Sequence, residues 1–181
     1  METVLILDFG AQYSQLIARR VREQNVYCEV KPCSISPDEI RELAPIGIIL
    51  SGGPQSVYES VSLHVDPALF SLGIPVLGIC YGCQLMAYSL GGTVAAATEA
   101  TAREYGKTLT EFDTQSAIFH GLPASSVTWM SHGDYISQVP DGFTVTAKTA
   151  VCPTAAMACP EKKLYGVQFH PEVQHLSLIH I

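Results

Sequence analysis

The stretch Pro75-Val76-Leu77-Gly78-Ile79-Cys80-Tyr81-Gly82-Cys83-Gln84 decides the fold. Residues 75–79 form a short apolar run rich in β-branched side chains, which is typical of a buried strand. Good helix formers follow over residues 83–90, and a Gly-Gly pair closes them, which indicates a helix. Cys80 therefore lies on a strand-to-helix turn in the pattern G-x-C-x-G, the cysteine counterpart of a nucleophile elbow.

So sharp a turn predicts strained backbone angles at Cys80 and requires glycine at the flanking positions Gly78 and Gly82. It would hold a thiol at the positive end of a helix, where thiolate is favoured over thiol. Two other interpretations stay open at this point. Cys80 could be a buried structural cysteine, or Cys80 and Cys83 could form a redox pair.

Composition narrows the function classes. A chain of 181 residues with 48% hydrophobic and 15% charged residues predicts one folded domain, alone or within a larger protein. The formal charge is −7 and the densest basic cluster is Arg19-Arg20-Val21-Arg22, which argues against nucleic-acid binding. There is no signal-peptide pattern and no apolar run long enough for a membrane span. Six cysteines in such a chain favour reduced thiols and a cytoplasmic location.

Strands and helices alternate along the first half of the chain. We expect strands over 3–7, 26–30, 46–50 and 75–79, with helices over 12–23, from the cap Ser36-Pro37-Asp38-Glu39, and near 66–72. Continuous apolar strands in this alternation predict a parallel sheet covered on both faces, with the active site beyond the carboxyl ends of the strands.

The sequence pattern changes after Gly92. Short strand candidates follow one another with turn signals between them, which predicts antiparallel hairpins added to the sheet. They cover 93–97, 105–110, 126–130, 143–149, 154–158 and 164–169. The predicted fold class is therefore α/β, with a mostly parallel central sheet flanked by helices and extended by antiparallel strands.

A histidine and a carboxylate follow the last strand candidate. His170 and Glu172 are two residues apart, so in extended geometry both side chains would point the same way, and Pro171 would favour that geometry. A cysteine nucleophile needs a histidine to take its proton, and the histidine needs a carboxylate to orient it. His170 taken alone would be a surface histidine; together with Cys80 it suggests a triad.

A Gly-Gly-Pro segment lies at the end of another strand. In Ser51-Gly52-Gly53-Pro54 the small residues allow backbone to approach a ligand closely. The N–H groups of Gly53 and Tyr81 could then form an oxyanion hole. The same segment could be an ordinary turn.

Together these motifs resemble the class I (triad) glutamine amidotransferases. The resemblance rests on Gly78-Ile79-Cys80-Tyr81-Gly82 with Gln84, on Ser51-Gly52-Gly53-Pro54 and on His170-Pro171-Glu172. Three further motifs resemble the amidotransferase domains of glutamine-hydrolysing GMP synthases: Asp8-Phe9-Gly10-Ala11-Gln12-Tyr13, Arg103-Glu104-Tyr105-Gly106 and Trp129-Met130-Ser131-His132-Gly133-Asp134. The likeness runs from residue 4 to about 173.

The resemblance implies a role for each site residue. Cys80 would be the nucleophile, His170 the base and acid, and Glu172 the orienting carboxylate. Gly53 and Tyr81 would form the oxyanion hole, and Gln84, with Ser131 and His132, would contact substrate glutamine or, for the last two, report to a partner domain.

The resemblance also implies a partner. Ammonia would pass to an ATP-pyrophosphatase domain that aminates XMP, and ATP and Mg²⁺ would be needed only there. No phosphate-binding glycine loop is present in this sequence, so we expect no cofactor in this chain.

Two features depart from the family pattern. Position 83 is cysteine where a larger residue is expected, and we expect it to face the core. Residues 176–181 match nothing expected, so we place the amidotransferase domain at 1–175 and interpret the last six residues as an unmatched tail, a sign of a fragment or an assembly artefact. A naturally separate subunit is the alternative. The same scaffold could also serve anthranilate or carbamoyl phosphate synthesis, or act as a non-catalytic interaction module.

Overall fold

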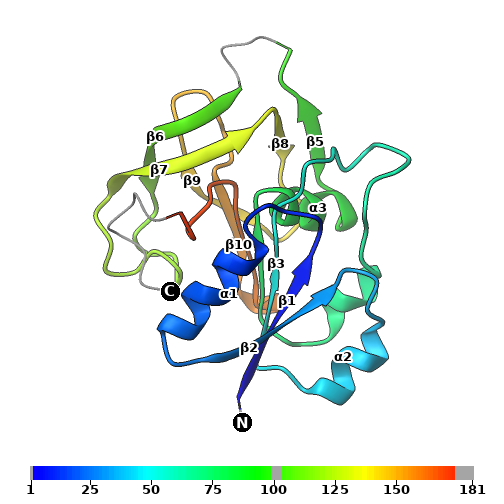
Figure 1. Cartoon of the computed structure of the whole chain (residues 1–181). Helices are drawn as coiled ribbons and strands as arrows, with labels where there is room; N and C mark the ends of the chain where they lie inside the picture. The colour runs from blue at the N-terminus through cyan, green and yellow to red at the C-terminus, as the bar shows by residue number, and fades with distance from the viewer. Residues whose placement is uncertain (1, 99–102, 174–181) are drawn as a thin grey trace.

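The computed structural model describes residues 2–98 and 103–173 of the chain. Its strands are β1 (Thr3–Asp8), β2 (Tyr27–Pro32), β3 (Gly47–Leu50), β4 (Val76–Ile79), β5 (Thr93–Ala96), β6 (Glu104–Phe112), β7 (Ser125–His132), β8 (Asp134–Gln138), β9 (Thr144–Lys148), β10 (Ala156–Cys159) and β11 (Leu164–Val167). One sheet has the order β2-β1-β3-β4-β11-β10-β9-β6-β7, and a second pairs β5 with β8 (Figure 1). The predicted tail, 176–181, lies outside the described residues.

The first half of the chain forms the predicted parallel sheet. β1 pairs in parallel with β2 and with β3, and β3 pairs in parallel with β4. The carboxyl ends of these strands meet at one edge, because parallel strands run in the same direction. Ser51 follows β3 there and Cys80 follows β4. The edge at which we expected the active site therefore brings the segments that begin at Ser51 and Cys80 together.

Of the three α-helices among the described residues, only α2 begins at a side-chain cap. They are α1 (Ser14–Glu23), α2 (Pro37–Leu43) and α3 (Tyr81–Ser89). At α2, Ser36 Oγ accepts from the N–H of Glu39 at 3.2 Å, and Glu39 Oε2 accepts from the N–H of Ser36 at 2.9 Å. This reciprocal pair is the predicted capping box, with Pro37 in the first turn. The segment near 66–72 forms a short 3₁₀ helix, η1 (Pro67–Ser71), instead of an α-helix.

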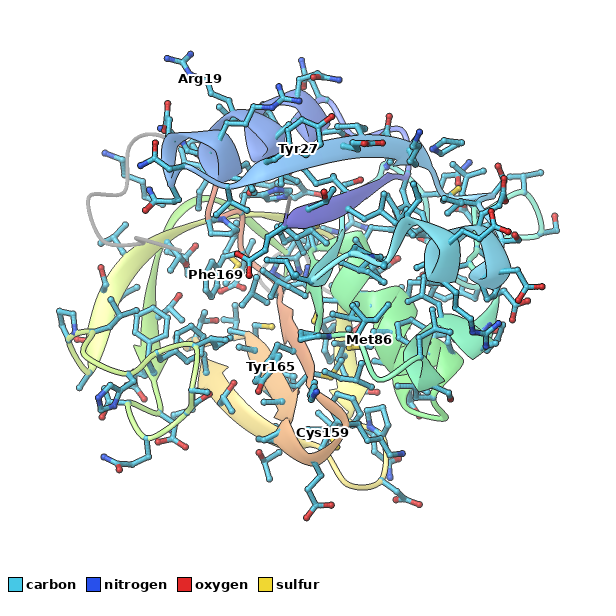
Figure 2. The ribbon with its side chains drawn as sticks, turned by 90° about the horizontal axis from the view of Figure 1, so that it is seen from below. Arg19, Tyr27, Met86, Cys159, Tyr165 and Phe169 are labelled. Atoms are coloured by element: carbon cyan, nitrogen blue, oxygen red, sulfur yellow. The ribbon has the colours of Figure 1, made fainter. Side chains whose placement is uncertain are left out.

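The core has two layers, one on each face of the sheet. Successive residues of β1 alternate between them, since Leu5 packs in one layer and Ile6 in the other. α1 covers the Ile6 layer with Ile17, whereas α3 covers the Leu5 layer with Met86. In Figure 2, Met86 lies on the α3 side of the sheet and Phe169 on the other.

The second half forms the predicted antiparallel extension. β6 pairs antiparallel with β7 and β9, and β10 pairs antiparallel with β9 and β11. β11 also pairs in parallel with β4, so it joins the two halves. Within the described residues, no helix has both the length and the apolarity to cross a membrane.

One strand was not expected from the sequence. β8 pairs antiparallel with β5 in the separate two-stranded sheet. Of its five residues only Ile136 is buried, so the segment carries no apolar run. Hydropathy patterning therefore could not identify it.

Candidate active site

Cys80 lies at the junction between β4 and α3. Its backbone has φ 52° and ψ −109°, a region that residues other than glycine rarely adopt. Two hydrogen bonds hold it there: its N–H donates to Val167 O at 2.8 Å, and its carbonyl accepts from the N–H of Gln84 at 3.1 Å. The predicted strand-to-helix turn is confirmed, and its strain falls on the cysteine.

The two flanking glycines are required by close backbone contacts. A Cβ at Gly78 would lie 2.6 Å from Gly82 O, and a Cβ at Gly82 would lie 2.5 Å from Leu50 O. No side chain tolerates contacts this short with backbone atoms. The G-x-C-x-G pattern thus allows α3 to begin directly against β3.

His170 and Glu172 are in contact, but not in the geometry we expected. β11 ends at Val167, and the N–H of Val173 bonds to His170 O at 3.4 Å, so the two residues lie on a turn instead of an extended strand. The expectation of extended geometry was wrong, because Pro171 occupies a turn position that its fixed φ also suits. The turn brings Glu172 Oε1 to 2.8 Å from His170 Nδ1, with both side chains buried.

The ring of His170 lies beside Cys80. Burial alone would lower the pKa of His170, but its hydrogen bonds to Cys80 and Glu172, and the charges of these groups, raise it to about 10. Because Glu172 holds Nδ1, Nε2 is the nitrogen left to exchange a proton with the sulfur. A Cβ built on Gly52 would lie 3.2 Å from His170 Cε1 and 3.7 Å from Cys80 Cβ, so glycine there leaves the pair room to meet.

Two further groups contact the sulfur of Cys80. Its thiol donates to Ser131 O, with the two atoms 3.6 Å apart. Gln168 Nε2 donates to the sulfur, also at 3.6 Å. Gln168 is fully buried and was missed from the sequence, although a polar residue inside the apolar segment 164–169 was a usable signal.

A cleft of about 360 Å³ opens at Cys80. Its lining includes every predicted oxyanion and substrate residue, namely Gly53, Tyr81, Gln84, Ser131 and His132, together with Pro54, Gln55, Ser56, Tyr105, Gly133 and Asp134. This volume is large enough for one amino acid with a polar side chain.

Gly53 and Gln84 are fixed in the cleft by close contacts. A Cβ on Gly53 would lie 3.0 Å from Phe9 O and 3.3 Å from the Tyr81 ring. The backbone of Gly53 therefore packs closely beside both Phe9 and Tyr81. Gln84 Nε2 donates to Asp134 O and to Gln168 Oε1, both at 3.0 Å. These bonds fix the Gln84 side chain at the edge of the cleft.

His132 lies with its ring turned into the protein. Its Nδ1 is 2.8 Å from Asp134 O and its Nε2 is 2.9 Å from Glu104 Oε2. Both ring nitrogens are therefore occupied, so the ring offers no free polar atom to a substrate. In the sequence, Glu104 stood out only as a member of the motif Arg103-Glu104-Tyr105-Gly106, with no role of its own. The structure shows that its side chain is buried.

Cys83 faces the core, as expected. It is fully buried against Gly166, where an added Cβ would lie 2.5 Å from its sulfur. Burial raises the pKa of Cys83 well above its ordinary value, which disfavours the thiolate that redox chemistry needs. All six cysteines are free thiols, so the Cys80–Cys83 pair is not joined.

The comparisons with known proteins agree with this geometry. The family model described as glutamine amidotransferase class-I matches residues 5–177, so the chain belongs to this family. Its curated relatives include proteins named GMP synthase [glutamine-hydrolyzing]: one from Clostridium botulinum (strain Alaska E43 / Type E3) and one from Bacillus pumilus (strain SAFR-032), each 56% identical over 174 residues. These matches cover 96% of this chain and 33% of each relative, so the chain spans about one third of their length.

Solved structures show the same fold. A protein from Thermoplasma acidophilum, described as a candidate GMP synthase subunit, superimposes with a TM-score of 0.86 at 31% identity, covering 98% of this chain and 87% of that one. A glutamine amidotransferase from Thermotoga maritima gives a TM-score of 0.76 at 24% identity, covering 95% and 76%. The second likeness concerns the fold alone. The predicted class I amidotransferase fold is thus confirmed.

Proposed function

We propose that this chain hydrolyses the side-chain amide of glutamine to glutamate and ammonia, with Cys80 as the nucleophile. The observation that carries the proposal is the contact of His170 with Cys80 and, through Nδ1, with Glu172 at 2.8 Å. Membership of the glutamine amidotransferase family supplies the substrate class.

The reaction follows from these contacts. His170 takes the thiol proton of Cys80 as the sulfur attacks the amide carbon, and it then donates that proton to the departing ammonia, which leaves a thioester on Cys80. Water then attacks the thioester carbon as His170 takes one of its protons, and His170 returns that proton to the departing sulfur, which releases glutamate and restores the thiol. Glu172 keeps His170 in one tautomer and stabilises the imidazolium. These steps need no cofactor, because every proton moves between these groups and water.

The cleft supplies the remaining interactions. The N–H groups of Gly53 and Tyr81 would bind the oxyanion of each tetrahedral intermediate. The N–H of Tyr81 belongs to the first residue of α3, where backbone donors are left without intrahelical partners. Gln84 and Ser131 would orient the bound glutamine from the opposite wall.

The use of the ammonia belongs to a larger assembly. Relatives named GMP synthase [glutamine-hydrolyzing] are about three times as long as this chain, which supports a synthetase partner, either a domain or a separate chain. We propose that it is an ATP-pyrophosphatase unit that uses ATP and Mg²⁺ to convert XMP to GMP with the ammonia made here. The names of these relatives favour this role over anthranilate or carbamoyl phosphate synthesis, and the intact Cys80–His170–Glu172 set disfavours a non-catalytic interaction module.

The test has two parts. Incubation with 6-diazo-5-oxo-L-norleucine, a glutamine-shaped electrophile, should label Cys80, as located by peptide mass spectrometry. Glutamate release should then be measured alone and with a separately made synthetase domain, ATP and XMP. We expect release to be weak alone and to rise with the partner, because closure against a partner commonly completes such sites.

Each part can fail separately. Labelling of Cys83 or of no cysteine would refute the hydrolase assignment. Full activity alone, unchanged by the partner and XMP, would refute the coupling and leave the hydrolase assignment intact.

A further inference from the structure

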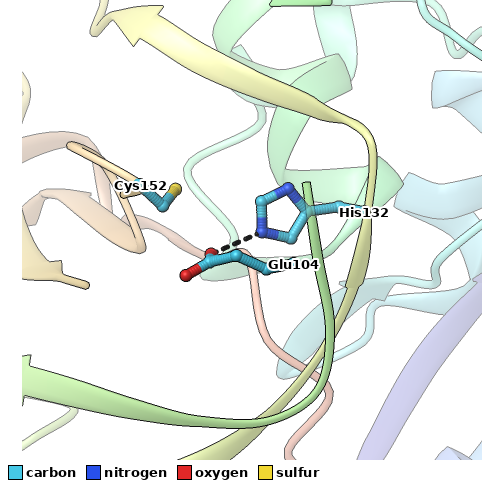
Figure 3. Close-up of side chains that lie close together, drawn as sticks. All are labelled: Glu104, His132 and Cys152. Atoms are coloured by element: carbon cyan, nitrogen blue, oxygen red, sulfur yellow. Dashed lines mark hydrogen bonds and ion pairs between the residues drawn. The ribbon is translucent and has the colours of Figure 1, made fainter. Parts of the chain in front are cut away.

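Glu104 and His132 form a buried pair, and Figure 3 shows the bond between them with Cys152 nearby. They face each other across β6 and β7, and their side chains are 4% and 2% exposed. His132 Nε2 lies 2.9 Å from Glu104 Oε2, and Thr149 Oγ1 donates to the other oxygen, Oε1. So well-bonded a pair in the interior needs an explanation that the triad does not give.

The hydrogen-bond partners determine where the protons are. Asp134 O can only accept, so His132 Nδ1, 2.8 Å away, must carry a hydrogen. Nε2 then meets a carboxyl oxygen, and the two can bond only if one further proton lies between them. Both ring nitrogens are satisfied in this arrangement, which fixes the orientation of the ring.

The fixed ring holds residues 131–134, where the chain bends at Gly133 between β7 and β8. Besides His132, the carbonyl of Asp134 accepts from Gln84 Nε2 at 3.0 Å. On the other side of this bend, the carbonyl of Ser131 accepts from the thiol of Cys80. The carbonyls that contact Gln84 and Cys80 thus belong to one bend, and Glu104 anchors it through the imidazole of His132.

We propose that Glu104 and His132 are positioning residues, which hold the 131–134 bend so that Gln84 and Cys80 are correctly placed for glutamine. This inference rests on the proposed hydrolysis of glutamine. Neither side chain has a free polar atom to offer the substrate, since both ring nitrogens of His132 are bonded and Glu104 is buried. Their effect should appear in how well a glutamine-shaped molecule reacts, more than in the reactivity of the thiol itself.

A metal centre is the competing explanation for this cluster. Ligand atoms of Glu104, His132 and Cys152 lie within 4.8 Å of one another. However, Cys152 donates its thiol proton to Thr154 O at 3.3 Å, and burial together with the charge of Glu104 raises its pKa to about 12. Hydrogen bonds already account for these polar atoms, so we favour the positioning role.

The test compares two electrophiles on the 181-residue chain. 6-Diazo-5-oxo-L-norleucine must bind as glutamine does before Cys80 displaces its N₂, whereas iodoacetamide needs only an accessible thiol. The ratio of the two labelling rates at Cys80 therefore measures substrate positioning apart from thiol reactivity. We expect Glu104→Ala to lower this ratio by about 10- to 100-fold, because displacements near 1 Å cost up to about 100-fold in rate.

Three variants make the test specific. Glu104→Gln can still donate a hydrogen bond to Nε2 of a neutral imidazole, so its ratio should stay within about 3-fold of the unaltered chain. Thr149→Val removes the hydroxyl that donates to Glu104 and accepts from the N–H groups of Val151 and Cys152, and its loss should be intermediate. Glu111→Ala, on the same strand but exposed and paired with Lys148, should change nothing. If Glu104→Ala fails to fold, an intermediate loss in Thr149→Val with little loss in Glu104→Gln still supports the positioning role. An unchanged ratio in Thr149→Val would overturn it.

The possible outcomes separate the explanations. An unchanged ratio in Glu104→Ala, or equal losses in Glu104→Gln and Glu104→Ala, would overturn the positioning role. One equivalent of zinc bound by the chain and lost in Cys152→Ser would overturn it in favour of a metal centre. Failure of the unaltered chain to react at Cys80 with the glutamine-shaped reagent would instead refute the proposed hydrolysis.

Discussion

Replacing Gly82 with alanine tests the elbow directly. The new Cβ would lie 2.5 Å from Leu50 O and 2.7 Å from Leu50 Cβ, whereas ordinary contacts begin at 3.4 Å. The start of α3 must therefore move away from β3 by roughly 0.9 Å, the difference between 3.4 and 2.5 Å. Inserting one methyl group into so tight a contact costs roughly 1–3 kcal/mol. For a chain of this size that lowers the Tm by roughly 2–12 °C.

The same shift should damage the chemistry. Cys80 and the N–H of Tyr81 lie on the turn that moves, and a displacement near 1 Å costs up to about 100-fold in rate. The assay is glutamate release together with calorimetric unfolding. Gly47→Ala is the matched control, since its Cβ would meet only Pro75 O at 3.8 Å. That variant should keep its activity and gain about 0.4–1 kcal/mol. A Gly82→Ala protein with unchanged Tm and full activity would refute the steric argument.

Three further predictions concern the triad. Cys80→Ser should lower glutamine hydrolysis by more than about 10³-fold, whereas Cys83→Ala should keep most of it, as measured by glutamate release. His170→Ala should be roughly 10- to 100-fold more damaging than Glu172→Ala, and the double variant hardly worse than His170→Ala; additive losses in single-turnover kinetics would contradict a triad. The pKa of His170 is raised from 6.5 to about 10, so its stabilisation is complete below pH 6.5 and is lost as the pH rises towards 10. The difference in unfolding free energy between the unaltered chain and His170→Gln should shrink over that range in urea titrations, and a growing difference would contradict the assignment.

Much of the parallel half could be predicted from the sequence. Its strands are continuous apolar runs, and the cap at Ser36 and the glycines around Cys80 are local signals that act within a few residues. The elbow was predictable because its glycine pattern is local, although only the demand for Gly78 arises within the strand-to-helix junction, whereas Gly82 is required by its contact with Leu50 on β3.

Features that depend on distant segments could not be predicted in the same way. The expectation that His170 and Glu172 lie in extended chain failed because the turn is set by tertiary contacts such as the bond from the N–H of His170 to Trp129 O, at 2.9 Å. Gln168 and Glu104 carry polar groups whose partners are far away in the chain. Hydropathy patterns record which residues are buried but not which buried polar groups meet.

The position of β11 has a consequence for how the protein matures. β11 occupies the middle of the large sheet, between β4 and β10, yet it is the last strand of the described chain. Cys80 and His170 follow neighbouring strands but are separated in sequence by β5 to β10. A chain emerging from the ribosome can therefore complete its first strands long before the base reaches the thiol. Such long-range closure is slow, so the cysteine gains its proton acceptor only after β5 to β10 have been made.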